Sequence, residues 1–514
     1  MGGPPIVPAG PSQDVLTFHN DNARTGQNLN ESILTPANVN MNAFGKLFVI
    51  GVDGKVDAEP LFASNVIAGG SAHNLLIVAT EHGSVYAFDA DNGSPIWRAS
   101  MLQPGETPSD DHGCSQVTPE IGVTATPVID RSAGPNGTIY VAAMSKGGPG
   151  QYFQRLHALN LATGVETSGG PKNIQASFPG SGDNSSGGMV GFDPGQYKER
   201  PGLLLMNGVV YTAWSSHCDI RPYTGWLMGY DQNSLAQVSV LNLTPNGNEG
   251  AFWNSGAGPA ADGNGNIFAL EGNGTFDTTM DASGFPSQGN FGNSFLKISA
   301  SNHSLAVSDF FAPFNVVAEN SIDQDLGSGG ALVLPDQMDA NSRTRHLVAG
   351  AGKDSNIYLA DRDNMGKFSP ANNNNAYQVI SSALGGPMFS MPAYFNGAIY
   401  YGAVGDSVKA FRLWNALLAL APSSQTSATF PYPGTTPSVS ANGAASGIVW
   451  AAENGAVAVL HAYDANNLAN ELYNSNQATG RDQFGPGNKF ITPMIAHGKV
   501  YVGTTNGVAV FGLR

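Results

Sequence analysis

Histidine, tyrosine and arginine side chains recur in polar loops along the first half of this 514-residue chain. His82 and His217 can transfer protons near neutral pH, because an unperturbed imidazole titrates at a pKa of about 6.5. Arg221 can neutralise a carboxylate, such as that of a uronic acid, while a histidine or tyrosine transfers the proton. The combination indicates chemistry on an acidic carbohydrate. The same region and a later segment also supply His112, Glu120, Tyr152, Asp219, Glu271, Asn273, Asp277, Asp325, Lys353 and Asp354.

The chain contains two cysteines, Cys114 and Cys218. Two cysteines permit one disulfide and exclude a cysteine-rich metal site. The alternative is a pair of free, buried thiols. Both residues lie in polar loop sequence, beside His112 and His217, which favours the disulfide.

The elements that must position these residues are short strands in a repeated unit, which is typical of a β-propeller. In residues 75–97 an apolar run is followed by a Gly turn, a second apolar run, an Asp/Gly turn and a third run. Gly and Asp tolerate the left-handed backbone of tight turns. A Pro or Gly pair opens a short apolar strand before each unit, at 59–60, 126–127, 200–201, 258–259, 329–330, 391–392, 436–437 and 492–493.

These markers predict an all-β fold, an eight-bladed β-propeller of four-stranded antiparallel blades. The last unit has three strands before the chain ends, and an unpaired strand at 45–50 precedes the first unit. Pairing this strand into the last blade removes two exposed edges. We therefore expect one domain over residues 44–514 and an N-terminal extension over 1–43.

In such a propeller, the turn between the second and third strands and the connection to the next blade open on one rim. The rim loops of the early units are long, and those of the later units are short. Long loops on a rigid scaffold concentrate function or cap the central channel. We expect a small-molecule or carbohydrate ligand in the funnel at this rim.

Composition excludes several classes of partner. The net charge of -16 disfavours nucleic acid and anionic membranes, because both require a basic surface. No run of about 18 apolar residues is present, so no membrane span is predicted. The first eleven residues lack the apolar stretch of a signal peptide, so a secreted or periplasmic location is inferred only indirectly. Oligomeric state, substrate and electron acceptor are not determined by the sequence.

The repeat at 85–97 and the segment at 21–39 resemble those of quinoprotein alcohol dehydrogenases, which use pyrroloquinoline quinone (PQQ). The resemblance covers nearly the whole chain. It implies a Ca²⁺ ion held by oxygen ligands and a quinone polarised by that ion. The implied metal ligands are Asp219, Asn273 and Asp325, with Asp325 also the base. Lys353 falls where the family has a cation beside the quinone, and Asn273 and Lys353 are implied cofactor contacts.

Two departures predict that PQQ does not bind in the family's usual manner. The family places a disulfide of adjacent cysteines against the quinone, whereas this chain has the single Cys114 there. The family also stacks a Trp under the quinone. This chain has Ala261 near that place, and the candidate cofactor contact Trp253 lies several residues earlier. Stacking supplies much of the binding of a flat cofactor.

Three hypotheses for the function follow. The first is a Ca²⁺/PQQ-type dehydrogenase of alcohols or sugars with a degenerate quinone pocket. The second is a polysaccharide lyase or glycosidase that uses the funnel His, Tyr and Arg residues. The third is a non-catalytic binding or assembly propeller, which predicts a large exposed apolar patch on one rim.

Overall fold

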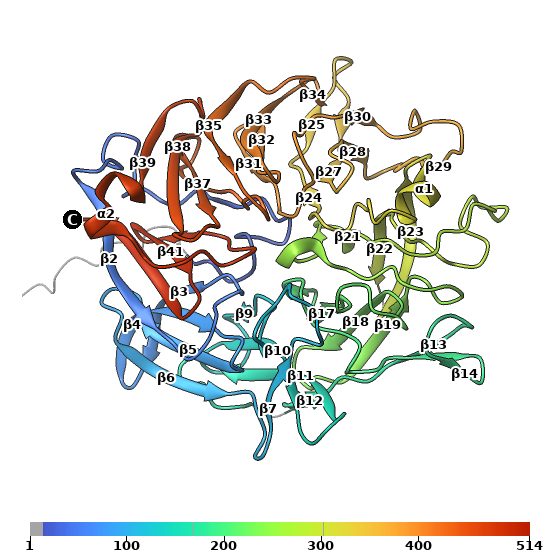
Figure 1. Cartoon of the computed structure of the whole chain (residues 1–514), viewed down its shortest axis with the longest axis horizontal. Helices are drawn as coiled ribbons and strands as arrows, with labels where there is room; N and C mark the ends of the chain where they lie inside the picture. The colour runs from blue at the N-terminus through green and yellow to red at the C-terminus, as the bar shows by residue number, and fades with distance from the viewer. Residues whose placement is uncertain (1–13, 168, 302) are drawn as a thin grey trace, which may run out of the picture.

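The computed structural model of the protein describes residues 14–167, 169–301 and 303–514. Within them the fold is built almost entirely from antiparallel β-sheet, and the sheets follow one another around a common centre (Figure 1). Each of eight successive sheets contains a four-stranded meander. In seven of them the four strands are consecutive along the chain, apart from short inserted strands. The eighth takes its outer strand from near the N-terminus.

The meanders in chain order are β3–β4–β5–β6 (Leu61–Ala68, Ser71–Ala79, Ser84–Asp89, Pro95–Ser100); β9–β10–β11–β12 (Val128–Asp130, Thr138–Lys146, Tyr152–Asn160, Lys172–Asn173); β16–β17–β18–β19 (Leu204–Met206, Val209–Ala213, Trp226–Asp231, Gln237–Asn242); β20–β21–β22–β23 (Ala260–Ala261, Asn266–Leu270, Phe295–Ser301, Ser304–Ala312); β24–β27–β28–β30 (Leu332–Val333, Leu347–Ala351, Ile357–Asp361, Gln378–Ile380); β31–β32–β33–β35 (Ala393–Phe395, Ala398–Tyr401, Asp406–Trp414, Ser424–Phe430); β36–β37–β38–β39 (Ser438–Asn442, Ala445–Glu453, Val459–Asp464, Glu471–Asn474); and β40–β41–β42–β2 (Met494–Ala496, Lys499–Gly503, Gly507–Leu513, Phe44–Gly51).

The remaining elements are short. They are the strands β1 (Gln27–Asn28), β7 (Thr107–Asp110), β8 (Glu120–Ile121), β13 (Ser177–Pro179), β14 (Ser185–Ser186), β15 (Met189–Gly191), β25 (Gln337–Met338), β26 (Thr344–Arg345), β29 (Lys367–Phe368) and β34 (Leu417–Leu418), the α-helices α1 (Val316–Asn320) and α2 (Thr479–Asp482), and the 3₁₀ turns η1 (Asn254–Gly256) and η2 (Ser475–Ala478).

The strand predicted at 45–50 pairs with the last strand of the chain, as expected. β2 runs antiparallel to β42, with Phe44 opposite Leu513 and Gly51 opposite Gly507. The first strand of each meander also begins within three residues of one of the predicted Pro or Gly markers. The antiparallel sheets and this closure are therefore confirmed.

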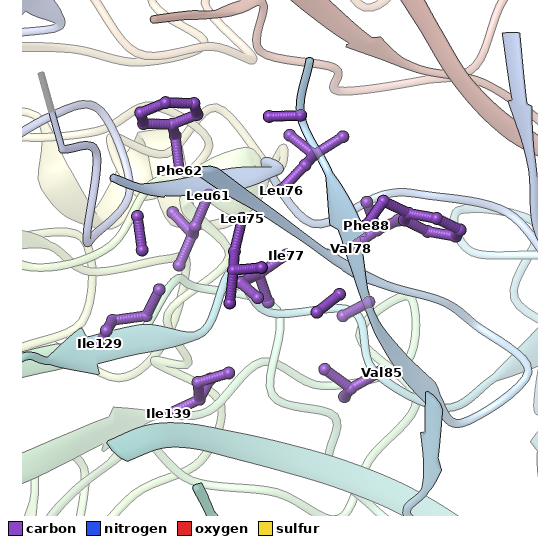
Figure 2. Close-up of a cluster of buried hydrophobic side chains, with 14 of the residues drawn as sticks. Leu61, Phe62, Leu75, Leu76, Ile77, Val78, Val85, Phe88, Ile129 and Ile139 are labelled. Atoms are coloured by element: carbon purple, nitrogen blue, oxygen red, sulfur yellow. The ribbon is translucent and has the colours of Figure 1, made fainter. Parts of the chain in front are cut away.

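Many strands are apolar and buried on both faces, and their side chains pack between neighbouring sheets. In Figure 2, Leu75 and Ile77 of β4 lie near Ile129 of β9 and Ile139 of β10. These four side chains are at most 3% exposed. Burial of this kind along every sheet holds the sheets together, because apolar surface removed from water contributes about 25 cal/mol per Å².

Residues 15–28 cross the inner ends of the sheets and contact the first strand of all eight meanders. Six of these contacts are hydrogen bonds between backbone groups, and the other two are donated by the side-chain amides of Asn22 and Asn28. The partners, in chain order, are Phe62, Ile129, Leu205, Ala261, Val333, Tyr394, Val439 and Ile495. One short segment thereby ties together strands that are hundreds of residues apart.

Arg24 is fully buried in the middle of this segment. Its guanidinium donates to the carbonyl oxygens of Pro259, Phe18 and Leu203 at 2.9 to 3.1 Å and to the Thr17 hydroxyl at 2.7 Å. The five donors of a guanidinium suit such a set of carbonyls, which would otherwise lack partners. Arg24 thus links the terminal segment to the third and fourth meanders.

Candidate functional site

A cavity of about 440 Å³ lies where the chain enters the first strands of the meanders. Its size lies within the usual range for small-molecule sites. Most of its wall comes from the connections that lead into the first strands, and the rest from two rim turns. The lining residues are Gln116, Cys218, Asp219, Trp253, Ser255, Asp323, Asp325, Ser328, Lys353, Phe389, Tyr432 and Phe490.

The polar centre of the cavity is an ion pair between Lys353 and Asp325. Lys353 follows β27, and its backbone N–H donates to the Asp325 carbonyl at 2.8 Å. Its ammonium lies 2.7 Å from Asp325 Oδ2 and also contacts Asp323. Asp325 is 1% exposed, and its Oδ1 has no hydrogen-bond partner within the described residues. The cavity therefore holds a buried carboxylate with one oxygen free to accept a proton.

Burial and the ion pair act in opposite directions on these two groups. Burial raises the pKa of Asp325, because it disfavours the charged form, and the Lys353 ammonium partly offsets this. Burial lowers the pKa of Lys353, but Asp325 and Asp323 outweigh it and the net shift is upward. Lys353 is therefore a cation at neutral pH, while Asp325 is a stronger base than a surface carboxylate.

Four aromatic side chains, Trp253, Phe389, Tyr432 and Phe490, form much of the rest of the wall. Tyr432 packs edge-to-face against Phe389 and Phe490, with ring centroids 5.5 and 6.2 Å apart. Such walls suit flat ligands, because aromatic faces stack on them.

Trp253 reaches the cavity because the chain turns sharply directly after it. Asn254 and Ser255 have left-handed φ angles of 45° and 53°. The Asn254 amide stabilises this turn by donating to the carbonyls of Leu270 and Gly329, at 2.9 and 2.8 Å. Ala261, near which the sequence comparison puts the family's Trp, instead lies in β20 and bonds to Asn22.

Two buried cations lie behind the aromatic wall. The Lys198 ammonium is 4.3 Å from the centre of the Trp253 ring and donates to the Ser216 carbonyl at 2.6 Å. Arg200 lies 5.0 Å from the Phe490 ring. Burial, with a smaller contribution from Arg200, lowers the pKa of Lys198 to about 7. A negatively charged ligand in the cavity would favour the protonated form of Lys198, because a nearby opposite charge stabilises a cation.

The predicted disulfide between Cys114 and Cys218 is present and borders the cavity through Cys218. The sequence lacks the family's pair of adjacent cysteines and its Trp under the quinone. The cavity wall nevertheless contains a disulfide cysteine, Cys218, and a tryptophan, Trp253. They come from other positions than in the resemblance.

His112 and His217 stack beside this disulfide, with ring centroids 4.0 Å apart, and His112 also contacts Tyr152 at 4.6 Å. His217 is 2% exposed, and neither ring nitrogen has a hydrogen-bond partner within the described residues. Burial, helped by Lys198, lowers the pKa of His217 to about 2. His217 is therefore a neutral packing residue at physiological pH.

His82 and Arg221 are not among the residues that line the cavity. His82 bonds to Glu120 at 2.9 Å. Both nitrogens of the Arg221 fork bond to Asp183, at 2.9 and 2.8 Å. His82 and Arg221 therefore each pair with a carboxylate outside the cavity wall, and neither lines the cavity together with the Lys353–Asp325 pair.

The predicted metal ligands Asp219, Asn273 and Asp325 lie in different surroundings, and calcium binding by them stays a prediction. Calcium takes six to eight oxygen ligands. Across residues 14–167, 169–301 and 303–514 no three Asp, Glu, His or Cys side chains gather closely enough to hold a metal. Asp325 Oδ2 is paired with Lys353, and Asp219 Oδ1 accepts from the Tyr223 hydroxyl at 2.7 Å. Asn273 is buried and is not part of the cavity wall.

Sequence reasoning missed several lining residues, namely Gln116, Ser255, Ser328, Phe389, Tyr432 and Phe490. All of them precede the first strand of a meander by a few residues to about a dozen. Their position relative to the Pro or Gly markers would have identified them, because every connection into a first strand opens at the same rim.

Large apolar side chains are exposed on the β33–β34 hairpin, away from the cavity. Trp414 is 80% and Leu420 77% exposed. No described helix is long and apolar enough to cross a membrane. The hypothesis of a non-catalytic binding or assembly propeller stays a prediction, and these exposed side chains are consistent with it.

Several solved structures share this fold at low sequence identity. The quinohemoprotein alcohol dehydrogenase from Comamonas testosteroni gives a TM-score of 0.63 at 13% identity, covering 98% of this chain and 80% of that one. A europium-containing methanol dehydrogenase gives 0.60 at 11% identity, covering 97% and 98%. BamB from Moraxella catarrhalis gives 0.52 at 12% identity, covering 91% and 99%.

At identities of 11 to 13%, the similarity to these structures is evidence for the fold alone. The chain therefore has the fold of PQQ-like propeller proteins, and the resemblance identified in the sequence is confirmed at that level. Neither a protein-family model nor a curated protein sequence matches the chain.

Proposed function

We propose that this protein is a dehydrogenase of alcohols or sugars that binds a flat quinone of the PQQ type in the cavity. The observation that carries the proposal is the Lys353–Asp325 pair, buried among aromatic rings and beside a disulfide, with one carboxylate oxygen unpartnered. The alcohol dehydrogenases and methanol dehydrogenase with this fold support the same class of reaction.

The wall residues would hold the quinone. Trp253 offers a ring face and Cys218 a sulfur surface, and the cations Lys198 and Arg200 behind the wall favour carboxylate groups on the ligand. A bound quinone supplies a two-electron acceptor. The proposal does not depend on calcium, and the predicted ligands Asp219, Asn273 and Asp325 are tested by running the titration with PQQ both with and without Ca²⁺.

Asp325 would accept the proton of the substrate hydroxyl on Oδ1, which is buried and unpartnered. Its raised pKa makes it a better base, since proton transfer is most efficient when the base titrates near the working pH. Lys353 would hold Asp325 in place through Oδ2 and donate to an oxygen of the ligand. The aromatic wall excludes water from the reacting atoms.

The eight sheets are then the blades of one propeller over residues 44–514, and residues 1–43 are an N-terminal extension, of which residues 15–28 contact every blade. We further propose a periplasmic or secreted location, because a disulfide persists in oxidising compartments.

The test is titration of the purified protein with PQQ, with and without added Ca²⁺, followed by tryptophan fluorescence and by reduction of an electron-accepting dye with a panel of alcohols and sugars. Asp325→Asn should retain PQQ binding and lower dye reduction by about 10²-fold or more, as for loss of a general base. The remaining rate should no longer rise with pH through the pKa of Asp325.

Asp406→Asn is the matched control. Asp406 also pairs with a lysine, Lys409, at 2.7 Å near the start of β33, but neither residue lines the cavity. Its dye reduction should equal that of the unaltered protein. Absence of both fluorescence quenching and dye reduction, under either Ca²⁺ condition, would overturn the proposed function.

A further inference from the structure

Residues 111–118 form a strap over the cavity. The strap is the turn between β7 and β8, which pair with each other and extend the second meander at the rim. Its backbone is ordered by a Cys114 N–H bond to the Asp111 carbonyl at 2.8 Å and by a Gly113 N–H bond to the Asp111 carboxylate at 3.0 Å. Gln116 of the strap lines the cavity.

One side of the strap is fixed to the loop that follows β17. The Cys114–Cys218 disulfide makes this attachment covalent. The stacked rings of His112 and His217, 4.0 Å apart, reinforce it. This side cannot separate from the cavity wall without breaking a covalent bond.

The other side of the strap is held by three hydrogen bonds to other meanders, and we call the two shorter ones the clasp. The third runs from the Lys55 ammonium to the Thr118 hydroxyl at 3.4 Å. The Tyr432 hydroxyl donates to Gln116 Oε1 at 2.8 Å, and the Lys489 ammonium donates to the Ser115 carbonyl at 2.8 Å. Tyr432 precedes β36 and Lys489 precedes β40, so the clasp joins the second meander to the seventh and eighth. Tyr432 is 37% exposed, so water competes for its hydroxyl.

The two sides therefore differ in kind. A disulfide is permanent on the time scale of ligand exchange, whereas hydrogen bonds at a solvent-exposed position break and reform readily. Tyr432, Gln116 and Cys218 all line the cavity. Release of the clasp would therefore uncover the cavity itself.

We propose that the strap is a lid, hinged at the Cys114–Cys218 disulfide, which opens by release of Gln116 and Ser115 from Tyr432 and Lys489 to admit ligand. Residues 15–28 hydrogen-bond to the second residue of every first strand, whereas the strap lies among the connections that precede these strands, where the cavity is. This inference concerns access to the cavity and holds for any ligand that the cavity binds.

The test uses the protein's own Trp253, which lies in the cavity wall, and needs no knowledge of the ligand. Quenching by acrylamide is measured for the protein and for Trp253→Phe, and the difference isolates Trp253. The same pair is then measured in a Tyr432→Phe/Lys489→Met background, which removes both clasp donors. The quenching constant of Trp253 should rise at least threefold in that background.

Hydrogen exchange of the backbone amides of residues 111–118 is the second measurement and should become at least tenfold faster in the clasp variant, while the melting temperature stays within a few degrees. If the double variant does not fold, Tyr432→Phe alone should give a smaller change in the same direction. Tyr394→Phe is the control, because Tyr394 lies in β31 near residues 15–28, and both readouts should stay at their original values. Equal quenching of Trp253 with and without the clasp, or unchanged exchange in the strap, would overturn the lid.

Discussion

Replacement of Arg24 by methionine should destabilise the whole fold, although Arg24 lies outside the repeated units. Methionine keeps most of the apolar stem and removes every donor. The carbonyls of Pro259, Phe18 and Leu203 then lose their bonds to the guanidinium. A buried carbonyl without a partner costs about 1 to 3 kcal/mol.

Three such carbonyls give a loss of at least about 3 kcal/mol in the free energy of unfolding, a large part of the 5 to 15 kcal/mol typical of a folded protein. Removing one partner of a buried ion pair costs about 3 to 5 kcal/mol for another reason, the opposite charge that is left unpaired. Here its close partners are uncharged, and burial lowers the pKa of Arg24 to about 10.

The assay is urea unfolding followed by tryptophan fluorescence, with the free energy taken by linear extrapolation. Arg131→Met is the control, because Arg131 makes an exposed contact to Asp14 at 3.3 Å and should cost less than about 1 kcal/mol. A loss below about 1 kcal/mol for Arg24→Met would refute the view that residues 15–28 tie the sheets together.

Two further predictions concern stability. His461 lies between Glu453 and Glu471; burial lowers its pKa, but the two carboxylates raise it further, and the net shift is upward. The stabilisation from the charge on His461 is therefore complete below pH 6.5 and is lost as the pH rises through the raised pKa. The urea midpoint of His461→Gln should therefore fall less between pH 6 and 9 than that of the unaltered protein. Parallel pH curves for the two proteins would contradict this. The disulfide closes a loop with a sequence separation of 104 residues, so Cys114→Ser/Cys218→Ser should lose up to about 4 kcal/mol in the free energy of unfolding; a loss near zero would mean that the unfolded chain is not restrained by the bridge.

Repetition is what made the architecture predictable. The Pro and Gly markers and the alternating apolar runs are local patterns, and each specifies a strand and a turn without reference to distant residues. The unpaired strand at 45–50 could be assigned to the last sheet because an incomplete meander leaves edges that need a partner. The disulfide was favoured because both cysteines lie in polar loops.

The membership of the cavity could be predicted only in part. Asp219, Asp325 and Lys353 were expected there because of the family resemblance, and they do line it. His82, His217, Arg221 and Asn273 were also expected, and they do not. The sequence of a loop does not determine which residues its side chains contact, because these contacts depend on the conformation of neighbouring loops. Arg221 is the example, since Asp183 holds both of its forked nitrogens.

The sequence by itself determined the strands, their grouping into sheets and the closure of the last sheet, because strand pairing depends on patterns that are written locally. Only the tertiary structure decided which side chains meet. The left-handed turn at Asn254 and Ser255 brings Trp253 into the cavity wall, and the chain wraps so that Cys218, Tyr432 and Lys353 surround one space. Such a meeting depends on loop conformations and on contacts between distant segments, which no local pattern specifies.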